Sequence, residues 1–188
     1  MKEEKKVGVD LGLNEEEKRT LHRIAKTVIE SKAKGKAVPE FKIESPLLKE
    51  NRGAFVTIHK KGQLRGCVGY IEGHGPLHKT IEEMAEAAAF RDPRFPPVGE
   101  KELPELELEI SVLTPLQRIK DVNDIQVGKH GIYIKKGWSS GLLLPQVATE
   151  YGWDRLTFLE HTCQKAGLPP HAWKDKDAEI YIFSADIF

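Results

Sequence analysis

The clearest pattern along the chain is an alternation of apolar and acidic residues over 105–112, and a second alternation covers 179–184. A period of two residues is typical of a β-strand with one buried and one solvent-facing side. Two further segments, 54–71 and 131–144, each consist of an apolar run, a glycine-containing polar turn and a second apolar run. Such segments predict β-hairpins, so the chain is expected to contain two sets of antiparallel strands.

Three other segments, 14–35, 76–92 and 154–167, place apolar residues at spacings of three and four, which predicts helices with one buried side. In the first, Asn14 can cap the helix, and Glu17 three residues later completes a capping-box pattern. In the third, the predicted buried face consists of Leu156, Leu159, Cys163 and Ala166.

Hairpin, helix and strand therefore follow one another twice, with Lys60-Lys61-Gly62 and Lys135-Lys136-Gly137 at the two turns. Runs of strands separated by single helices predict an α+β fold with mostly antiparallel sheets and a few helices. The repeated order suggests an internal duplication of hairpin, helix and strand, although two copies are fewer than a repeat array requires. Residues 1–13 are expected to form a flexible arm, and 14–188 a single domain.

Composition narrows the classes of protein to consider. Lys plus Arg and Asp plus Glu both number 29 among the 188 residues, so no net charge attracts the chain to nucleic acid or to an anionic membrane. No apolar run approaches the length of a membrane span, and no signal-peptide pattern is present. Two cysteines far apart in the sequence do not imply a disulfide scaffold. We therefore expect a cytoplasmic protein without nucleic-acid or membrane partners.

The segment Leu64–Ile71 holds the chemistry that an ordinary buried strand lacks, because Arg65, Gly66 and Cys67 follow one another in it. Glycine weakens strands and is kept where a bulge forms or where another group approaches the backbone. One interpretation is a bent strand in which Arg65 binds an anion and lowers the pKa of Cys67, a candidate nucleophile, provided that a glycine bulge does not separate the two side chains. The alternative is a bulged strand with an inert cysteine and an internally paired arginine.

The loop 91–97 is the second candidate region. It contains three prolines together with Asp92, Arg94 and Phe95, and stiff loops that carry reactive or charged side chains are common places for a site. We predict that this loop and Cys67 share one wall of a site. His74 and His78 have the spacing of a metal-binding pair, but Gly75-Pro76 interrupts a helix across them and no third ligand is evident, so neither a metal nor a cofactor is expected.

Six motifs in the chain, in this order, resemble the AMMECR-domain family: Leu64–Gly69, Ala87–Phe95, Glu109–Leu113, Leu143–Ala148, Gly152–Asp154 and Lys165–Leu168. The resemblance runs from about residue 14 to the last residue, with Val68 where isoleucine is more usual. It implies a domain with two lobes around a cleft, here 14–112 and 113–188. It also implies a place beside a Memo-like protein and a radical-SAM protein, as one part of a three-part system.

Three functions follow as hypotheses. The first is an enzyme or ligand-binding component that uses Arg65, Cys67, Asp92 and Arg94 on an unknown small molecule. The second is a non-catalytic interaction module in which the arginines and Phe95 bind a partner protein. The third, a regulator linked to nucleic acid, is opposed by the zero net charge. The sequence identifies neither a reaction nor a general base.

Overall fold

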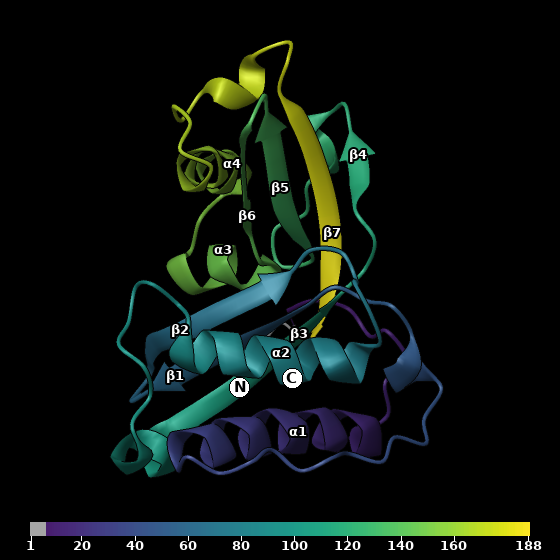
Figure 1. Cartoon of the computed structure of the whole chain (residues 1–188). Coiled ribbons are helices and arrows are strands. Elements are labelled where there is room, and N and C mark those ends of the chain that lie inside the picture. Colours follow the sequence, from purple (N-terminus) through teal and green to yellow (C-terminus); the bar gives the residue numbers. More distant parts are fainter. Residues whose placement is uncertain (1–6) are drawn as a thin grey trace, which may run out of the picture. The chain divides into compact units, whose positions relative to one another are not determined.

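Helices and antiparallel strands form two units in the computed structural model, which describes residues 7–188 (Figure 1). The first unit comprises Leu11–Leu113 together with Ile187 and Phe188, and the second comprises Thr114–Asp186 together with the segment that ends at Asp10. Every strand pairing within the two units is antiparallel. The predicted α+β fold is therefore confirmed.

The first unit has three strands, with β1 between β2 and β3. Its elements are α1 (Glu15–Ala33), η1 (Leu47–Lys49), β1 (Ala54–Lys60), β2 (Gln63–Tyr70), α2 (Leu77–Phe90), η2 (Glu100–Glu105) and β3 (Leu106–Leu113). Helix α2 packs against β1 and β2, and α1 lies beside α2 and contacts β3 (Figure 1). The last residue, Phe188, exchanges two backbone hydrogen bonds with Ile110.

The second unit has β5 between β6 and β7, and the short β4 pairs with β7. Its elements are β4 (Gln117–Ile119), η3 (Val122–Asp124), β5 (His130–Lys136), β6 (Ser139–Leu143), α3 (Pro145–Tyr151), α4 (Arg155–Lys165), η4 (Ala172–Lys174) and β7 (Glu179–Ile187). Helix α4 packs against β5 and β6, and α3 contacts β5. Both predicted hairpins are present, one in each unit.

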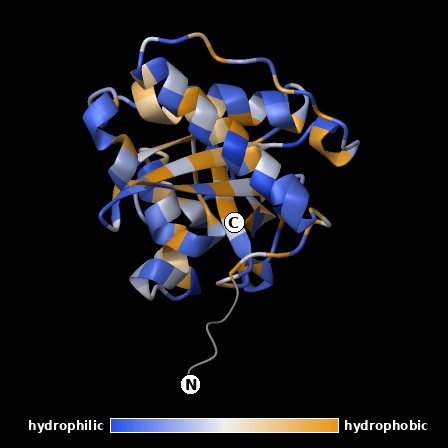
Figure 2. Cartoon of the chain, turned by 90° about the horizontal axis from the view of Figure 1, so that it is seen from below, coloured by the Kyte–Doolittle hydropathy of each residue, from blue (hydrophilic) through white to orange (hydrophobic). Residues whose placement is uncertain are grey.

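Local sequence signals explain where the helices begin. The side chain of Asn14 accepts a hydrogen bond from the Glu17 backbone N–H at 2.9 Å, and the Glu17 carboxylate accepts one from the Asn14 N–H at 2.8 Å. This predicted capping box satisfies two N–H groups that a helix start leaves open. Figure 2 shows that the strands hold many hydrophobic residues, whereas the helices combine hydrophobic and hydrophilic ones, as amphipathic elements do.

One predicted helix face is wrong in part, because Leu159 and Cys163 are buried as predicted and Leu156 is not. Leu156 is 47% exposed, and the buried side of α4 consists instead of Phe158, Leu159, Thr162 and Cys163. Two overlapping sets of positions in this segment have helical spacing, and burying the large ring of Phe158 removes more apolar area from water than burying Leu156. The sequence pattern could not choose between the two sets without knowledge of which side meets the sheet.

The expected arm, 1–13, is only partly described, because residues 1–6 lie outside the described range. Within the described part, the Val9 N–H donates to the Ala185 carbonyl at 2.8 Å, and Leu13 is buried in the core of the first unit. The chain passes from the first unit to the second between Leu113 and Thr114. The cleft between two lobes and the internal duplication stay predictions.

Candidate functional site

A β-bulge in the first hairpin sets the direction of Arg65. Ile58 pairs with Gly66 and His59 pairs with Leu64, so no residue of β1 stands opposite Arg65. An extra residue of this kind bends the strand and turns its side chain away from the regular position. Gly66 comes next, and a Cβ there would lie 2.1 Å from the Ala88 carbonyl oxygen. Only glycine lets α2 lie this close to the strand.

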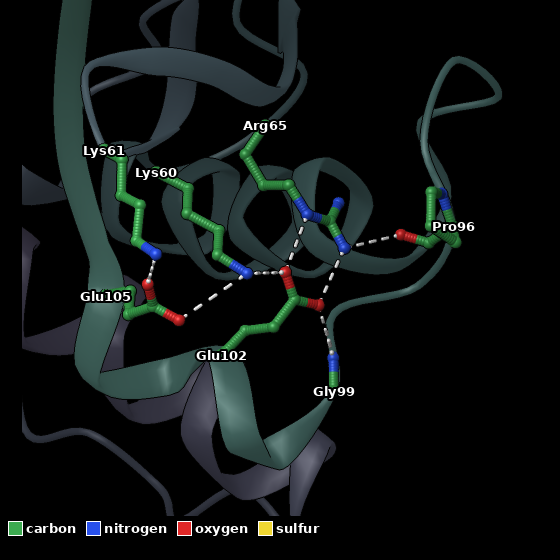
Figure 3. Close-up of polar contacts among 7 residues, drawn as sticks. All are labelled: Lys60, Lys61, Arg65, Pro96, Gly99, Glu102 and Glu105. Carbon is green, nitrogen blue, oxygen red and sulfur yellow. Dashed lines mark hydrogen bonds and ion pairs between the residues drawn. The ribbon is translucent and has the colours of Figure 1, made fainter.

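The Arg65 guanidinium is bonded inside the first unit (Figure 3). Its Nε and Nη2 donate to the two oxygens of Glu102 at 3.1 and 3.0 Å, and Nη2 also donates to the Pro96 carbonyl at 2.9 Å. The side chain is only 11% exposed. Arg65 is thus internally paired, as the alternative interpretation expected, and an anion could take its bidentate position only by displacing Glu102.

Glu102 connects the hairpin to the segment before β3. Besides Arg65 it accepts hydrogen bonds from Lys60 Nζ at 3.0 Å and from the Gly99 N–H at 3.1 Å (Figure 3). These hydrogen bonds lower the pKa of Glu102 to about 2, and the bonds from Arg65 have the largest effect. The carboxylate therefore stays ionised down to strongly acidic pH, and it holds 96–105 against the hairpin.

Asp92 ties the loop 91–97 to Cys67. Its buried carboxylate accepts from the Cys67 N–H at 3.0 Å, and from Arg94 through the backbone N–H at 3.1 Å, Nε at 3.0 Å and Nη2 at 2.7 Å. These hydrogen bonds lower the pKa of Asp92 to about 2, and those from the Arg94 side chain have the largest effect. Arg94 Nη2 also donates to the Cys67 carbonyl at 3.2 Å. The predicted proximity of Cys67 and this loop is confirmed.

The loop presents its other residues to solvent. Arg91, Pro93, Arg94 and Pro96 are exposed and Phe95 is half-buried, whereas Val98 is buried and its N–H donates to the Ala89 carbonyl at 2.9 Å. The Phe95 ring centroid lies 5.5 Å from Arg94 Cζ and 5.9 Å from Arg65 Cζ. The loop is therefore fixed at Asp92 and at Val98, with an arginine and an aromatic ring between these two points.

The Cys67 thiol does not have the environment predicted for it. Burial, the largest effect, raises its pKa, whereas the hydrogen bond with the Thr57 hydroxyl, 3.3 Å from the sulfur, and the charge of Arg94 lower it by less. The charges of Asp92 and Glu109 add smaller increases, and the net shift is upward. The expectation that Arg65 lowers the pKa of Cys67 is wrong, because the bulge turns Arg65 toward Glu102. In the resting protein the sulfur is a thiol.

The comparisons with known proteins agree on one family. A family model described as AMMECR1 matches residues 22–188. The chain belongs to the AMMECR1 family. A protein from Methanothermobacter thermautotrophicus is 45% identical over 94% of this chain and 95% of its own length. One from Methanopyrus kandleri is 44% identical over 92% and 88%. A crystal structure of an uncharacterized protein from Pyrococcus horikoshii has a TM-score of 0.85, with 42% identity over 89% of this chain and 88% of that one.

In this AMMECR1-family chain, the sequence-predicted residues Arg65, Gly66, Cys67, Asp92, Arg94 and Phe95 all lie in the first unit, and contacts join them. Sequence reasoning missed Glu102 and Lys60, the partners that neutralise and position Arg65. The only signal for Glu102 is its place in the acid-rich run 100–109. Such a run is typical of a solvent-exposed surface, so it does not predict a nearly buried ion pair.

Residues 7–188 contain no group of three or more His, Cys, Asp or Glu side chains placed to hold a metal ion. His78 Nδ1 lies 2.9 Å from the Leu48 carbonyl oxygen, and the His74 ring packs edge-on against Tyr70. The two histidines that have metal-pair spacing therefore have separate structural contacts. Within the same range, no helix combines the length and the apolar character that crossing a bilayer requires.

Proposed function

We propose that this AMMECR1-family chain is a protein-interaction module whose docking element is the loop 91–97. The observation that carries the proposal is the state of Arg94, whose side chain is 43% exposed although the buried carboxylate of Asp92 fixes its guanidinium. An exposed arginine that is already held in one conformation loses little side-chain entropy when a partner binds.

The chemistry of the loop suits a protein surface better than a small anion. Arg65 and Asp92 are bonded to internal partners, with Arg65 Nη1 alone in the guanidinium lacking an acceptor in the described part of the chain, and the Cys67 thiol is protonated at rest. The groups that would carry a reaction are therefore largely engaged. Arginine and aromatic side chains are frequent anchors of protein interfaces. Arg94 Nη1 bonds no acceptor within residues 7–188, and Arg91 is exposed nearby, so the partner surface should present a carboxylate.

The partners we propose are the Memo-like and radical-SAM proteins that the family resemblance implies. The test is calorimetric titration of this protein with each of them, both taken from the same organism. Arg94→Ala and Phe95→Ala should each weaken binding about tenfold or more, the loss expected of interface anchors.

The matched control is Arg118→Ala in the second unit, because Arg118 is 61% exposed and also faces a carboxylate, that of Glu179, at 3.5 Å. This variant should bind as the wild type does. The proposal is wrong if neither protein binds, or if Arg94→Ala and Phe95→Ala weaken binding no more than Arg118→Ala. Thermal unfolding of each variant separates a lost contact from a lost fold.

A second candidate is the cysteine-dependent enzyme or ligand-binding component. The observation in its favour is that Cys67 is half-buried beside Asp92 and Arg94, whereas Cys163 is wholly buried. Native mass spectrometry after incubation with a metabolite extract tests it. A small molecule that the wild type retains and Cys67→Ser loses supports this candidate. If the wild type retains no small molecule, the enzyme candidate is wrong and the interaction module is the remaining proposal.

A further inference from the structure

A cavity of about 590 Å³ lies in the first unit, between α1 and the segment formed by η2 and β3. Its lining consists of His22, Arg23, Lys26, Thr27, Ile29, Glu30, Lys34, Leu103, Pro104, Leu106 and Leu108. None of these residues belongs to the site around Cys67. The volume is within the range of small-molecule pockets.

The floor of this α1–β3 pocket is apolar. Leu103, Leu106 and Leu108 are half-buried and pack against the core of the first unit, and Ile29 belongs to that core. Leu106 and Leu108 are two residues apart on β3, so they project from the same side of the strand. Part of the surface of these three leucines remains open to water, and a ligand with an apolar body would cover it.

The rim of the pocket is cationic. Arg23, Lys26 and Lys34 come from α1 and its C-cap, His22 stands beside them, and Glu30 is the only carboxylate among the lining residues. Lys26 Nζ is 3.9 Å from Glu30 in a solvent-exposed pair, and Arg23 and Lys34 form no ion pair within residues 7–188. The chain as a whole has equal numbers of acidic and basic side chains, so this rim is a local excess of positive charge.

We propose that the α1–β3 pocket binds an amphipathic carboxylate, a small molecule whose apolar body lies on the leucine floor and whose acid group meets the cations of α1. An apolar floor with a few charged groups along one side is the usual construction of a site that fixes both the position and the direction of its ligand. The inference does not depend on the docking role of the loop 91–97.

The probe is decanoate, used below its critical micelle concentration and followed by calorimetry or by NMR of the protein amides. One saturable molecule per chain is expected. Arg23→Gln combined with Lys26→Gln should weaken decanoate binding about tenfold, the sum expected from two exposed charge interactions. Leu103→Ser should weaken binding through the floor instead, by about threefold to tenfold, since it removes part of the apolar contact.

Three controls separate this site from adventitious binding. Decanol has the same hydrocarbon chain without the charge and should bind more weakly than decanoate, and acetate should not bind. Arg118→Gln combined with Lys120→Gln, two exposed cations of the second unit, should leave binding unchanged. Three results would each overturn the proposal. Decanol and decanoate bind equally well, or the Arg23→Gln and Lys26→Gln double variant keeps the wild-type affinity. In the third, the protein binds an acidic amphipathic peptide but does not bind decanoate.

Discussion

The two hairpins are built to the same plan. In each, the sequence Lys-Lys-Gly is followed four residues later by a second glycine, Gly66 in β2 and Gly141 in β6. Both of these glycines meet the backbone of a covering helix, because an added Cβ would lie 2.1 Å from the Ala88 carbonyl oxygen or 2.6 Å from the Ala166 nitrogen. Each hairpin therefore keeps a glycine where its helix crosses.

The difference is one residue. The first turn uses Lys61 and Gly62, both with positive φ (52° and 74°), whereas the second uses Gly137, with φ of 58°, and Trp138. Both are two-residue hairpin turns. The first begins at the second lysine of Lys-Lys-Gly, and the second begins at the glycine, one position later. Gly66 pairs with Ile58, eight positions earlier, and Gly141 with Ile134, seven positions earlier. The additional residue is Arg65, so the shifted turn and the bulge together give the first hairpin a buried cation.

Replacing the two helix-facing glycines is expected to have the largest effect. Gly66→Ala should lower the free energy of unfolding by about 3 kcal/mol, because a methyl group cannot fit against a backbone carbonyl without moving α2. Gly141→Ala should cost less, since its nearest contact is longer. Urea denaturation measures both, and Gly75→Ala, with no atom within 4 Å of the new Cβ, is the control. Equal stability of Gly66→Ala and Gly75→Ala would contradict the close packing.

Removing the partner of the buried cation comes next. Glu102→Gln should destabilise the protein by about 2 kcal/mol, because it leaves the Arg65 guanidinium buried without a counter-charge. Glu105→Gln, which breaks the Lys61 pair at 2.8 Å and the Lys60 pair at 3.7 Å, should cost much less than Glu102→Gln, since Lys61 is 77% exposed and solvent screens the pair. Urea denaturation of the two variants decides whether Arg65 depends on this carboxylate, and equal losses would show that it does not.

Acid should destabilise the first unit by protonating Glu102 and Asp92. The pKa values of Glu102 and Asp92 are both about 2, below their ordinary 4.5 and 3.8, so the folded state favours the ionised forms. Their stabilisation is complete above about pH 5 and is lost as pH falls toward about 2. Unfolding free energies at several pH values should fall less steeply for Glu102→Gln than for the wild type. Parallel curves would show that Glu102 contributes nothing to the acid response.

Deleting Arg65 tests the bulge itself. The deletion gives the first hairpin the seven-residue spacing of the second, so β1 and β2 can pair regularly. We expect it to cost about as much as Arg65→Ala, on the order of 1–2 kcal/mol, because both changes leave Glu102 without its main partner while Lys60 remains. Urea denaturation of both variants is the measurement. A deletion far more costly than the alanine variant would mean that the bulge has a further structural role.

The smallest expected effect concerns the two cysteines, Cys67 in the first hairpin and Cys163 in α4, which covers the second. Cys67 is half-buried and Cys163 is wholly buried, so iodoacetamide should modify Cys67 first. Because the pKa of Cys67 is raised above 9.0, its modification should be slow at neutral pH and still accelerating at pH 9. Peptide mass spectrometry gives both rates, and Arg65→Ala should not change the Cys67 rate. Full modification of Cys67 at pH 7 would contradict the raised pKa and support the hypothesis that Cys67 is an activated nucleophile.

Much of the fold follows from local sequence. The capping box of Asn14 and Glu17, the two hairpin turns and the alternation near residue 110 act over a few residues, so their structures could be read directly. The candidate site follows from local signals of the same kind. Glycines within a strand and prolines beside charged residues are locally unusual, and they mark Cys67, Asp92 and Arg94 without reference to any tertiary contact.

Tertiary structure decided what those residues do. Glu102 is 37 positions from Arg65, and its run of acidic neighbours gave no reason to expect a nearly buried ion pair. The pKa of Cys67 depends on burial beneath elements distant in sequence, and the buried face of α4 depends on which side meets the sheet. Backbone periodicity and capping are local interactions, so sequence determines them. Charge pairing and desolvation depend on which groups the completed fold brings together.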